Sequence, residues 1–335
     1  MTTAQPDLLE SSNPPALDVL GCGTILVDRV QYVRGDRPPK EIVQWGGPAG
    51  NTLALLSASG LRTALIGAIG ADENEPFVRS AMRTFGVDDR LVVVQPERRT
   101  ASVRIRVEVA ENAVSSDRIH CLGLHPARGR PQLLCRTLNA AHFAALEQSR
   151  LLHFDSANPA TASLARAAHE RGIPVSLDLP RFRRSALRDV KRMLGFCDLL
   201  FANERLAQRH LEALGAHSFL EPYPDMRLAV ITHGANGAEA RTGGADGVRE
   251  VAVDAVAPRG FHDSLGAGDA FIAGVLDAVV RGGLLERLNT QALDECLRDA
   301  ARFASRACEH AGAKGLASHL VQLQHRQANR LLTSD

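Results

Sequence analysis

The stretch LLHFDSANPATASLARAAHERGIPVSLDL, residues 151–179, contains a short apolar run, a segment with helical periodicity and a second short apolar run. Such runs predict buried strands, and we expect a helix over Thr161–Arg171 between them. Residues 197–214 repeat this order, with CDLLFA followed by a helix expected over Glu204–Leu214. Strands that alternate with helices are typical of a parallel sheet covered on both faces, so the sequence predicts an α/β fold with a mostly parallel central sheet.

Two segments nearer the N-terminus interrupt this alternation. Residues 24–45 and 91–120 contain runs in which apolar and polar residues alternate, such as VDRVQYV and ASVRIRVEV. This pattern predicts half-exposed strands, and we expect a small β-sheet that projects from the main domain. The main domain is expected to span residues 17–330, after a polar, proline-containing flexible tail at residues 1–16.

Composition and charge exclude several classes of protein. The chain of 335 residues has 39 Lys+Arg against 38 Asp+Glu and only 4% aromatic residues, which argues against a dedicated nucleic-acid partner. The six cysteines have no C-x-x-C spacing and the histidines no metal-binding spacing, so reduced thiols are expected. We find no signal-peptide pattern and no membrane-length apolar run, and we expect a cytoplasmic protein.

The strongest chemical signal is Asp263-Ser-Leu-Gly-Ala-Gly-Asp269, placed directly before a long apolar helix. The small residues Gly266, Ala267 and Gly268 would let an anion approach the free N–H groups of the first helical turn. A carboxylate beside a bound phosphate is costly, so Asp269 indicates a base that accepts the proton of an attacking hydroxyl. The alternative is that Asp269 only compensates the helix dipole.

A second signal opens another helix, at Gly46-Gly47-Pro-Ala-Gly-Asn51. The glycines permit close approach of a ligand to the backbone, and Asn51 offers both a donor and an acceptor to hydroxyl groups. Asp28 follows the first strand, and ligands of open α/β sheets bind beyond the carboxyl ends of strands. Taken singly, each of these features also fits an ordinary turn or a solvated surface acid.

Together the motifs resemble those of the ribokinase-like, or PfkB, family of carbohydrate kinases. The similarity runs in family order from about residue 17 to residue 320 and includes a G-x-x-G-x-D stretch at residues 67–72. The two most specific signatures lie at opposite ends: residues 46–51 resemble G-G-x-x-x-N, and residues 263–269 resemble D-T-T-G-A-G-D. Residues 232–237 also resemble the T-x-G-x-x-G nucleotide loop. The resemblance implies a ribokinase-like fold in which the small sheet acts as a lid.

The resemblance also implies a reaction and a set of roles. The chain would transfer a phosphoryl group from ATP to a hydroxyl of a sugar or sugar acid, with Asp269 as general base and Gly266–Gly268 as the N–H hole for the transferring group. Acceptor contacts would come from Asp28, Gly46, Gly47, Asn51, Arg106 and Arg181. Nucleotide contacts would come from Asn203, Thr232, Gly234 and Gly237.

Two departures from the family pattern affect the expected metals. The N-x-x-E motif associated with Mg²⁺ reads Asn203-Glu-Arg-Leu206, so Glu204 is the nearest available acid. Leu265 stands where Thr or Asn is usual. Asp263 and nearby carbonyl groups would supply a monovalent-cation site, which leaves K⁺ dependence open.

The acceptor is less clearly indicated. An arginine that reaches the pocket, such as Arg106 or Arg181, would favour an acidic or phosphorylated sugar through paired hydrogen bonds, whereas most arginines are solvated. The alternatives are a nucleoside kinase of the same fold and a catalytically silent sugar or nucleotide sensor. A homodimer formed through the lid sheet is expected, with a small-molecule acceptor and no nucleic-acid or membrane partner.

Overall fold

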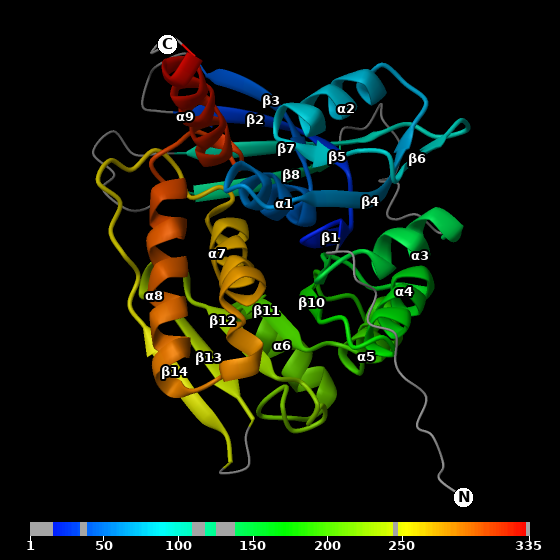
Figure 1. Cartoon of the computed structure of the whole chain (residues 1–335), viewed down its shortest axis with the longest axis vertical. Coiled ribbons are helices and arrows are strands. Elements are labelled where there is room, and N and C mark those ends of the chain that lie inside the picture. The colour runs from blue at the N-terminus through cyan, green and yellow to red at the C-terminus, as the bar shows by residue number, and fades with distance from the viewer. Residues whose placement is uncertain (1–15, 34–38, 109–117, 125–137, 244–246, 333–335) are drawn as a thin grey trace, which may run out of the picture.

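The computed structural model describes residues 16–33, 39–108, 118–124, 138–243 and 247–332. Its main body is one twisted sheet of ten strands covered by helices on both faces, with a second sheet at one end (Figure 1). Along most of the ten-stranded sheet the order is β14-β13-β12-β11-β10-β9-β1-β4-β5, and β6 also pairs with β4. The strands are β1 (Val19–Cys22), β4 (Thr63–Gly70), β5 (Val87–Asp88), β6 (Val92–Gln95), β9 (Leu152–Phe154), β10 (Val175–Asp178), β11 (Leu199–Asn203), β12 (Leu228–Thr232), β13 (Ala238–Thr242) and β14 (Arg249–Val253).

Two apolar clusters, one on each face of the sheet, hold the helices. One cluster joins α1 (Pro48–Ala58), α2 (Asn74–Thr84), α7 (Ala267–Gly282), α8 (Thr290–Ala307) and α9 (Gly315–Leu332). The other joins α3 (Ala140–Glu147), α4 (Pro159–His169), α5 (Leu187–Leu194) and α6 (Glu204–Leu214). Because both faces are covered, a central strand such as β4, TALIGAIG, is buried at every residue.

The predicted α/β architecture is confirmed. The sheet is parallel except at the edge formed by β12, β13 and β14. The helix expected over Glu204–Leu214 has those bounds, and the one expected over Thr161–Arg171 occurs as α4, shifted towards the N-terminus by the cap at Asn158. Asn158 accepts hydrogen bonds from the N–H groups of Ala160 and Thr161, which fixes this start.

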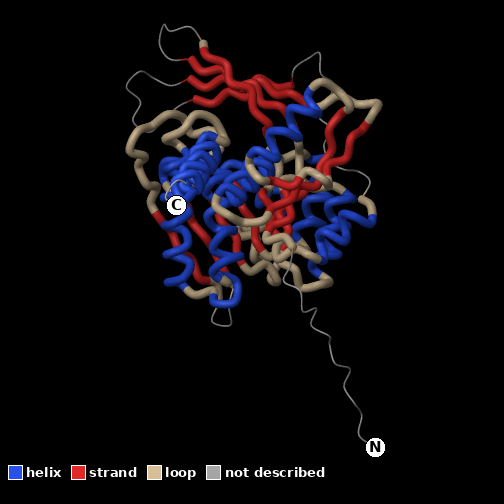
Figure 2. Tube along the Cα trace, turned by 45° about the horizontal axis from the view of Figure 1, so that its top comes forward, coloured by secondary structure: helices blue, strands red, loops and turns tan. Residues whose placement is uncertain are grey.

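The small sheet has the order β3-β2-β7-β8, formed by β2 (Leu26–Val33), β3 (Lys40–Gly46), β7 (Ala101–Glu108) and β8 (Arg118–Leu124), and it stands apart from the main sheet in Figure 2. Its apolar side, with Val30 and Val107, packs on Phe261 and Leu265 of the main domain. Leu265, the departure from the family motif, is therefore part of this contact. The prediction for residues 91–120 was wrong in one part, because Val92–Gln95 pairs with β4 and extends the main sheet.

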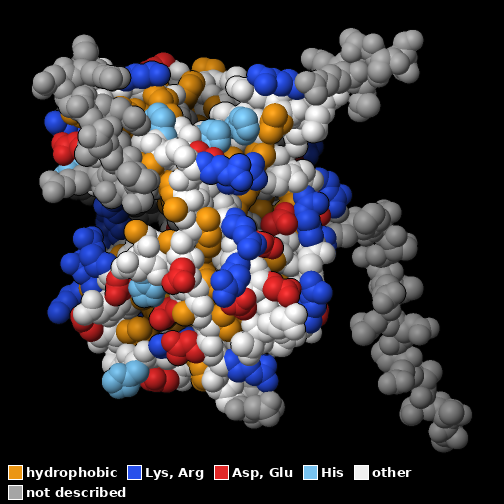
Figure 3. Space-filling model, turned by 90° about the vertical axis from the view of Figure 1, so that its left-hand side faces the viewer, with side chains coloured by type: hydrophobic (Ala, Val, Ile, Leu, Met, Phe, Trp, Pro, Cys, Tyr) orange, Lys and Arg blue, Asp and Glu red, His pale blue; other side chains and the backbone are white. Residues whose placement is uncertain are grey.

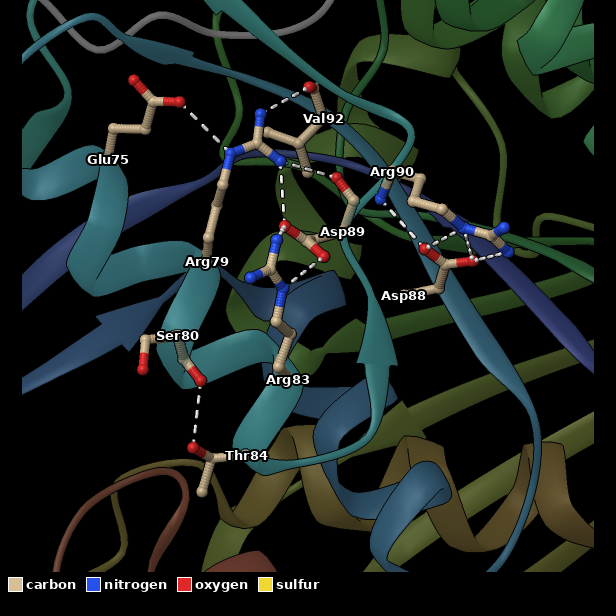
Figure 4. Close-up of polar contacts among 9 residues, drawn as sticks. All are labelled: Glu75, Arg79, Ser80, Arg83, Thr84, Asp88, Asp89, Arg90 and Val92. Carbon is tan, nitrogen blue, oxygen red and sulfur yellow. Dashed lines mark hydrogen bonds and ion pairs between the residues drawn. The ribbon is translucent and has the colours of Figure 1, made fainter.

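A network of arginines ties α2 to the β5–β6 region (Figure 4). Arg79 and Arg83 both bond the carboxylate of Asp89, and Arg79 also donates to the carbonyl of Val92 at 3.2 Å. Hydrogen bonding to Arg83 and Arg79 outweighs the burial of Asp89 and lowers its pKa. The network holds β6 beside β4 and so fixes the start of the loop that leads into β7.

The surface shown in Figure 3 carries basic and acidic side chains interspersed over its described part. Among the helices that the structure describes, none is long and apolar enough to cross a membrane. Cys121, Cys197 and Cys296 are free cysteines in the part of the chain that the structure describes, and Cys135 lies outside it.

Candidate active site

Carboxylates gather where parallel strands of the main sheet end. Asp155 follows β9 and Asp178 ends β10, so both lie at the same edge of the sheet. Asp155 accepts hydrogen bonds from the N–H groups of Thr24, at 3.0 Å, and Ala49, at 3.2 Å. Burial raises the pKa of Asp155 to about 6, although these bonds act in the opposite direction. Burial, and then the charges of Asp269 and Asp155, raise the pKa of Asp178 well above its ordinary value.

Asp269 lies in the first turn of α7 and faces this edge. The side-chain amide of Asn51, in α1, donates to its Oδ2 at 2.7 Å. Burial raises the pKa of Asp269 to about 7, against the hydrogen bond from Asn51 and the charge of Lys314, which lower it. A carboxylate with a pKa near neutrality and a fixed orientation is suited to general-base chemistry.

Asp28 is a further buried carboxylate near Asp269, and glycines opposite it make room for its side chain. Asp28 in β2 pairs with Gln44, and a Cβ placed on Gly46 would lie 2.2 Å from its Oδ2, so Gly46 makes room for the carboxylate. Gly47 has φ of 118°, and a Cβ there would meet the carbonyl oxygen of Thr24 at 2.0 Å. Burial raises the pKa of Asp28 to about 6. The structure thus brings together four predicted acceptor residues, Asp28, Gly46, Gly47 and Asn51, around Asp269.

The sequence patterns assigned no role to Lys314, Asp155 or Asp178. Lys314 lies in the turn before α9, with 3% of its surface exposed, and its ammonium group bonds the side-chain oxygen of Asn51. The positions of Asp155 and Asp178 at the ends of predicted strands could have identified both as candidate site residues. No sequence motif marks Lys314.

A cavity of about 480 Å³ adjoins the start of α7. Thr232, Gly234 and Gly237 line one side of it, and Ala267 and Gly268 line the other. Its remaining wall is mainly apolar, with residues such as Val256, Pro258, Phe261, Phe271 and Ala304. The volume suits a nucleotide-sized ligand whose base packs on the apolar wall and whose phosphates point to the N-terminus of α7.

Gly266 provides the tight turn before α7. It is the N-cap residue, with φ of 83°, and a Cβ on it would lie 2.6 Å from the Cα of Ala313. A Cβ on Gly268, by contrast, would meet nothing within 4 Å. Gly266 therefore shapes the loop, whereas Gly268 keeps the backbone of the first turn open to the cavity.

The residues expected to hold metals lie elsewhere or are already bonded. Asp263 is fully buried and accepts hydrogen bonds from the hydroxyl of Tyr32 and the N–H groups of Leu265 and Gly312. Glu204 is 70% exposed, interacts with His233 at 3.5 Å and does not line the 480 Å³ cavity. Within the described residues, no three His, Cys, Asp or Glu side chains cluster as a metal site.

Asn203 and the two arginines also lie apart from the cluster around Asp269. Asn203 caps α6 by accepting from the N–H of Leu206 at 3.0 Å, although its backbone pairs with Thr232 of the cavity wall. Arg106 forms an ion pair with Glu108 at 2.8 Å and lies on the side of β7 that faces away from the main domain. Arg181 is exposed beyond Asp178.

The chain resembles known kinases along most of its length. It is 32% identical over 269 residues to an ATP-dependent ribose-1-phosphate kinase of Halopiger xanaduensis, covering 79% of this chain and 83% of the relative. It is 26% identical over 260 residues to a nucleoside kinase of Methanothermobacter thermautotrophicus, covering 72% and 73% of the two chains.

Solved structures share the fold. A fructokinase of Xylella fastidiosa with bound ATP superposes with a TM-score of 0.71 at 19% identity, over 93% of this chain and 99% of that one. A Burkholderia thailandensis nucleoside kinase in complex with inosine gives 0.66 at 19% identity, over 92% and 97%. The sequence model described as pfkB family carbohydrate kinase matches residues 18–319. The protein is therefore a phosphotransferase that belongs to the pfkB family of carbohydrate kinases.

Proposed function

We propose that this enzyme transfers the γ-phosphoryl group of ATP to a hydroxyl of a ribosyl compound that carries a substituent at C1. The observation that supports it most is the position of Asp269 between a group of polar residues and a cavity. Asn51 holds its carboxylate on the side of Asp28 and Gly46, and the helix whose first turn contains it opens onto the cavity lined by Thr232 and Gly268. An acceptor and a nucleotide would meet at this carboxylate.

Each residue of the site has a separate role in this proposal. Asp269 takes the proton of the attacking hydroxyl, and the backbone N–H groups of Gly266–Gly268 stabilise the charge that develops on the transferring group. ATP supplies the phosphoryl group, and ADP leaves when the terminal phosphoanhydride bond of ATP breaks. Asp28 and Asn51 hold the other hydroxyls of the acceptor, since both can bond hydroxyl groups directly.

We infer the acceptor class from the relatives and from charge. Ribose 1-phosphate and nucleosides, the acceptors in the relatives' names, share a ribose substituted at C1. We place ribose 1-phosphate first, because Arg98 and Arg99 are exposed beside the end of β4, at the sheet edge where the acceptor would bind. The backbone of Arg98 and Arg99 packs directly on Gly70, the last residue of β4. Their guanidinium groups would meet a phosphate at the rim, while the acidic interior would take the neutral hydroxyls.

The remaining roles are also proposals. The small sheet would act as the lid that excludes water during transfer, and its outward side, with Arg104 and Arg106, would face a second copy in a homodimer. Mg²⁺ would arrive with the nucleotide, because it commonly keeps several water ligands and binds through substrate phosphates. Asp263 would order the loop before α7, and K⁺ binding near it would be detected as K⁺-dependent turnover.

The test is ADP release from ATP and Mg²⁺ with one acceptor at a time, with and without K⁺. Ribose 1-phosphate, inosine, adenosine, ribose, fructose and a sugar acid form the panel, and Asp269→Asn is the control. We expect the highest kcat/KM with ribose 1-phosphate and loss of turnover in the control. A preference for nucleosides would change the acceptor, whereas ligand-induced thermal shifts without any ADP release would support the sensor alternative.

A further inference from the structure

Lys314 is a buried cation in contact with the candidate active site. It lies in the turn between α8 and α9, and of the lysines and arginines that the structure describes it is the one that is buried. Its Nζ lies 4.5 Å from the centre of the Trp45 ring and donates to the carbonyl oxygen of Trp45 and to Oδ1 of Asn51. These contacts connect it to α1 and β3, which are remote in sequence.

The chemistry of an ammonium group fixes the orientation of Asn51. Lysine has three donors and no acceptor, so the atom of Asn51 that faces Lys314 must be the carbonyl oxygen. The amide nitrogen of Asn51 then faces Asp269, whose ionised carboxylate only accepts hydrogen bonds, and the observed Nδ2–Oδ2 distance is 2.7 Å. A reversed Asn51 would present its oxygen to Asp269, and that arrangement is favourable only when Asp269 carries a proton.

The positive charge of Lys314 also acts on the carboxylates around it. Three further carboxylates each interact electrostatically with Asp269 or with Lys314. They are Asp28 from β2, Asp155 after β9 and Asp178 from β10. The positive charge of Lys314 lowers the pKa of both Asp28 and Asp269. Its own pKa is lowered to about 8 by burial, so it is mostly charged at neutral pH.

We propose that Lys314 is a positioning residue for phosphoryl transfer, which fixes the amide of Asn51 so that Asp269 is held as an ionised base. This inference rests on the proposed role of Asp269. It assigns a function in the reaction to a side chain outside every motif, supplied by the turn after α8. The same turn donates the N–H of Gly312 to Asp263 at 3.1 Å and places Ala313 against Gly266, so it supports the α7 loop as well.

The main test is Lys314→Met, which removes the donors and the charge but keeps an unbranched side chain beneath Trp45. We expect kcat to fall about 100-fold, as for a misplaced catalytic group. We also expect the acidic limb of the kcat/KM profile to move up by about one pH unit, because an opposite charge nearby lowers a carboxyl pKa by that order. The affinity for ATP should stay unchanged, since Lys314 does not line the nucleotide cavity.

Two further variants separate orientation from charge. Lys314→Gln removes the charge but keeps an amide that can donate to Asn51, so it should shift the acidic limb and lose less kcat than Lys314→Met. Lys191→Met is the matched control, because Lys191 is exposed on α5 at the other face of the sheet, and it should leave both quantities unchanged. A lower kcat in Lys314→Met without a shift of the limb would overturn the proposal and leave only a structural role.

A second readout does not need turnover. Carbon-13 NMR of protein labelled at aspartate carboxyl groups follows the titration of Asp269, whose signal is assigned by its loss in Asp269→Asn. We expect its midpoint to be higher in Lys314→Met or, if that variant does not fold, in Lys314→Gln. An unchanged midpoint would refute the inference. Absence of acceptor-dependent ADP release by the unmodified enzyme would instead refute the proposed function, and the titration would still report on Lys314.

Discussion

The hydroxyl of Tyr32 in β2 donates a hydrogen bond of 2.9 Å to Oδ2 of Asp263, the residue that begins the loop before α7. The two residues are 231 positions apart in the chain. One belongs to the small sheet, and the other orders the turn that presents Gly266–Gly268 to the cavity. The position of the small sheet is therefore linked directly to the backbone groups proposed to stabilise the transferring phosphoryl group.

Tyr32→Phe tests this link. The variant keeps the ring, whose centroid lies 5.5 Å from that of the His262 ring in an edge-on contact. It removes the hydroxyl that donates to a buried carboxylate. We expect a loss of about 1.5–3 kcal/mol in unfolding free energy, the range for a hydrogen bond to a charged group. Calorimetry should show a lower Tm, and ADP release should show a lower kcat. Tyr223→Phe is the matched control, because the other tyrosine packs on the opposite face of the sheet, and its Tm should change less.

Gly266→Ala and Gly268→Ala are expected to act in different ways. At Gly266 the left-handed φ and the 2.6 Å approach to the backbone of Ala313 leave no room for a methyl group, so this variant should lose at least about 1 kcal/mol of stability. Gly268→Ala has free space and should keep its Tm. Its methyl group would narrow the cavity beside the phosphate position and raise the Kd for ATP. Equal effects of the two changes on Tm would contradict this division of roles.

The fold was predictable because it depends on local patterns. Strand–helix alternation from residue 151 onward identified the parallel sheet, and the helix starts follow short motifs. The same reasoning failed for Val92–Gln95, because an isolated apolar run does not reveal which sheet will accept it. The orientation of Arg106 could not be predicted for a related reason. Alternation separates two sides of a strand, but only packing on Phe261 shows which side faces the main domain.

The candidate site was predictable where a motif carries the chemistry, as at Asn51 and Asp269. Their hydrogen bond joins residues 218 positions apart and confirms that the two signatures meet. Lys314 was not predictable, since a single lysine in a turn has no spacing to distinguish it from surface lysines. Its burial follows from the packing of α9 and of Trp45, which only the tertiary structure shows.

Asp28 should make stability fall as the pH rises, the reverse of a salt-bridged carboxylate. Its pKa is about 6 in the folded chain and 3.8 as the reference value, so the folded state binds its proton more tightly. That contribution to stability is fully present below the reference value and is lost as the pH rises through 6.

Asp28→Asn should therefore gain stability relative to the unmodified chain between pH 4 and 7, by about 3 kcal/mol. Urea unfolding at each pH measures the difference. Asp88→Asn provides a control of opposite sign, because the hydrogen bond from Arg90 lowers the pKa of Asp88. Its removal should cost stability at neutral pH and progressively less in acid. A pH-independent difference for Asp28→Asn would show that its carboxyl group titrates normally in the folded enzyme.

The pH dependence of turnover should report the ionisation of Asp269. A general base acts only when unprotonated, so kcat/KM should rise about tenfold per pH unit below the pKa of Asp269, about 7, and level off above it. The charge of Asp28 contributes to raising this pKa, so Asp28→Asn should move the acidic limb to lower pH, opposite to the shift expected for Lys314→Met. Rates of ADP release at subsaturating acceptor, from pH 5.5 to 9, measure the acidic limb in the unmodified enzyme and in Asp28→Asn. A kcat/KM that stays level down to pH 5.5, or an acidic limb that persists in Asp269→Asn, would contradict this role of Asp269.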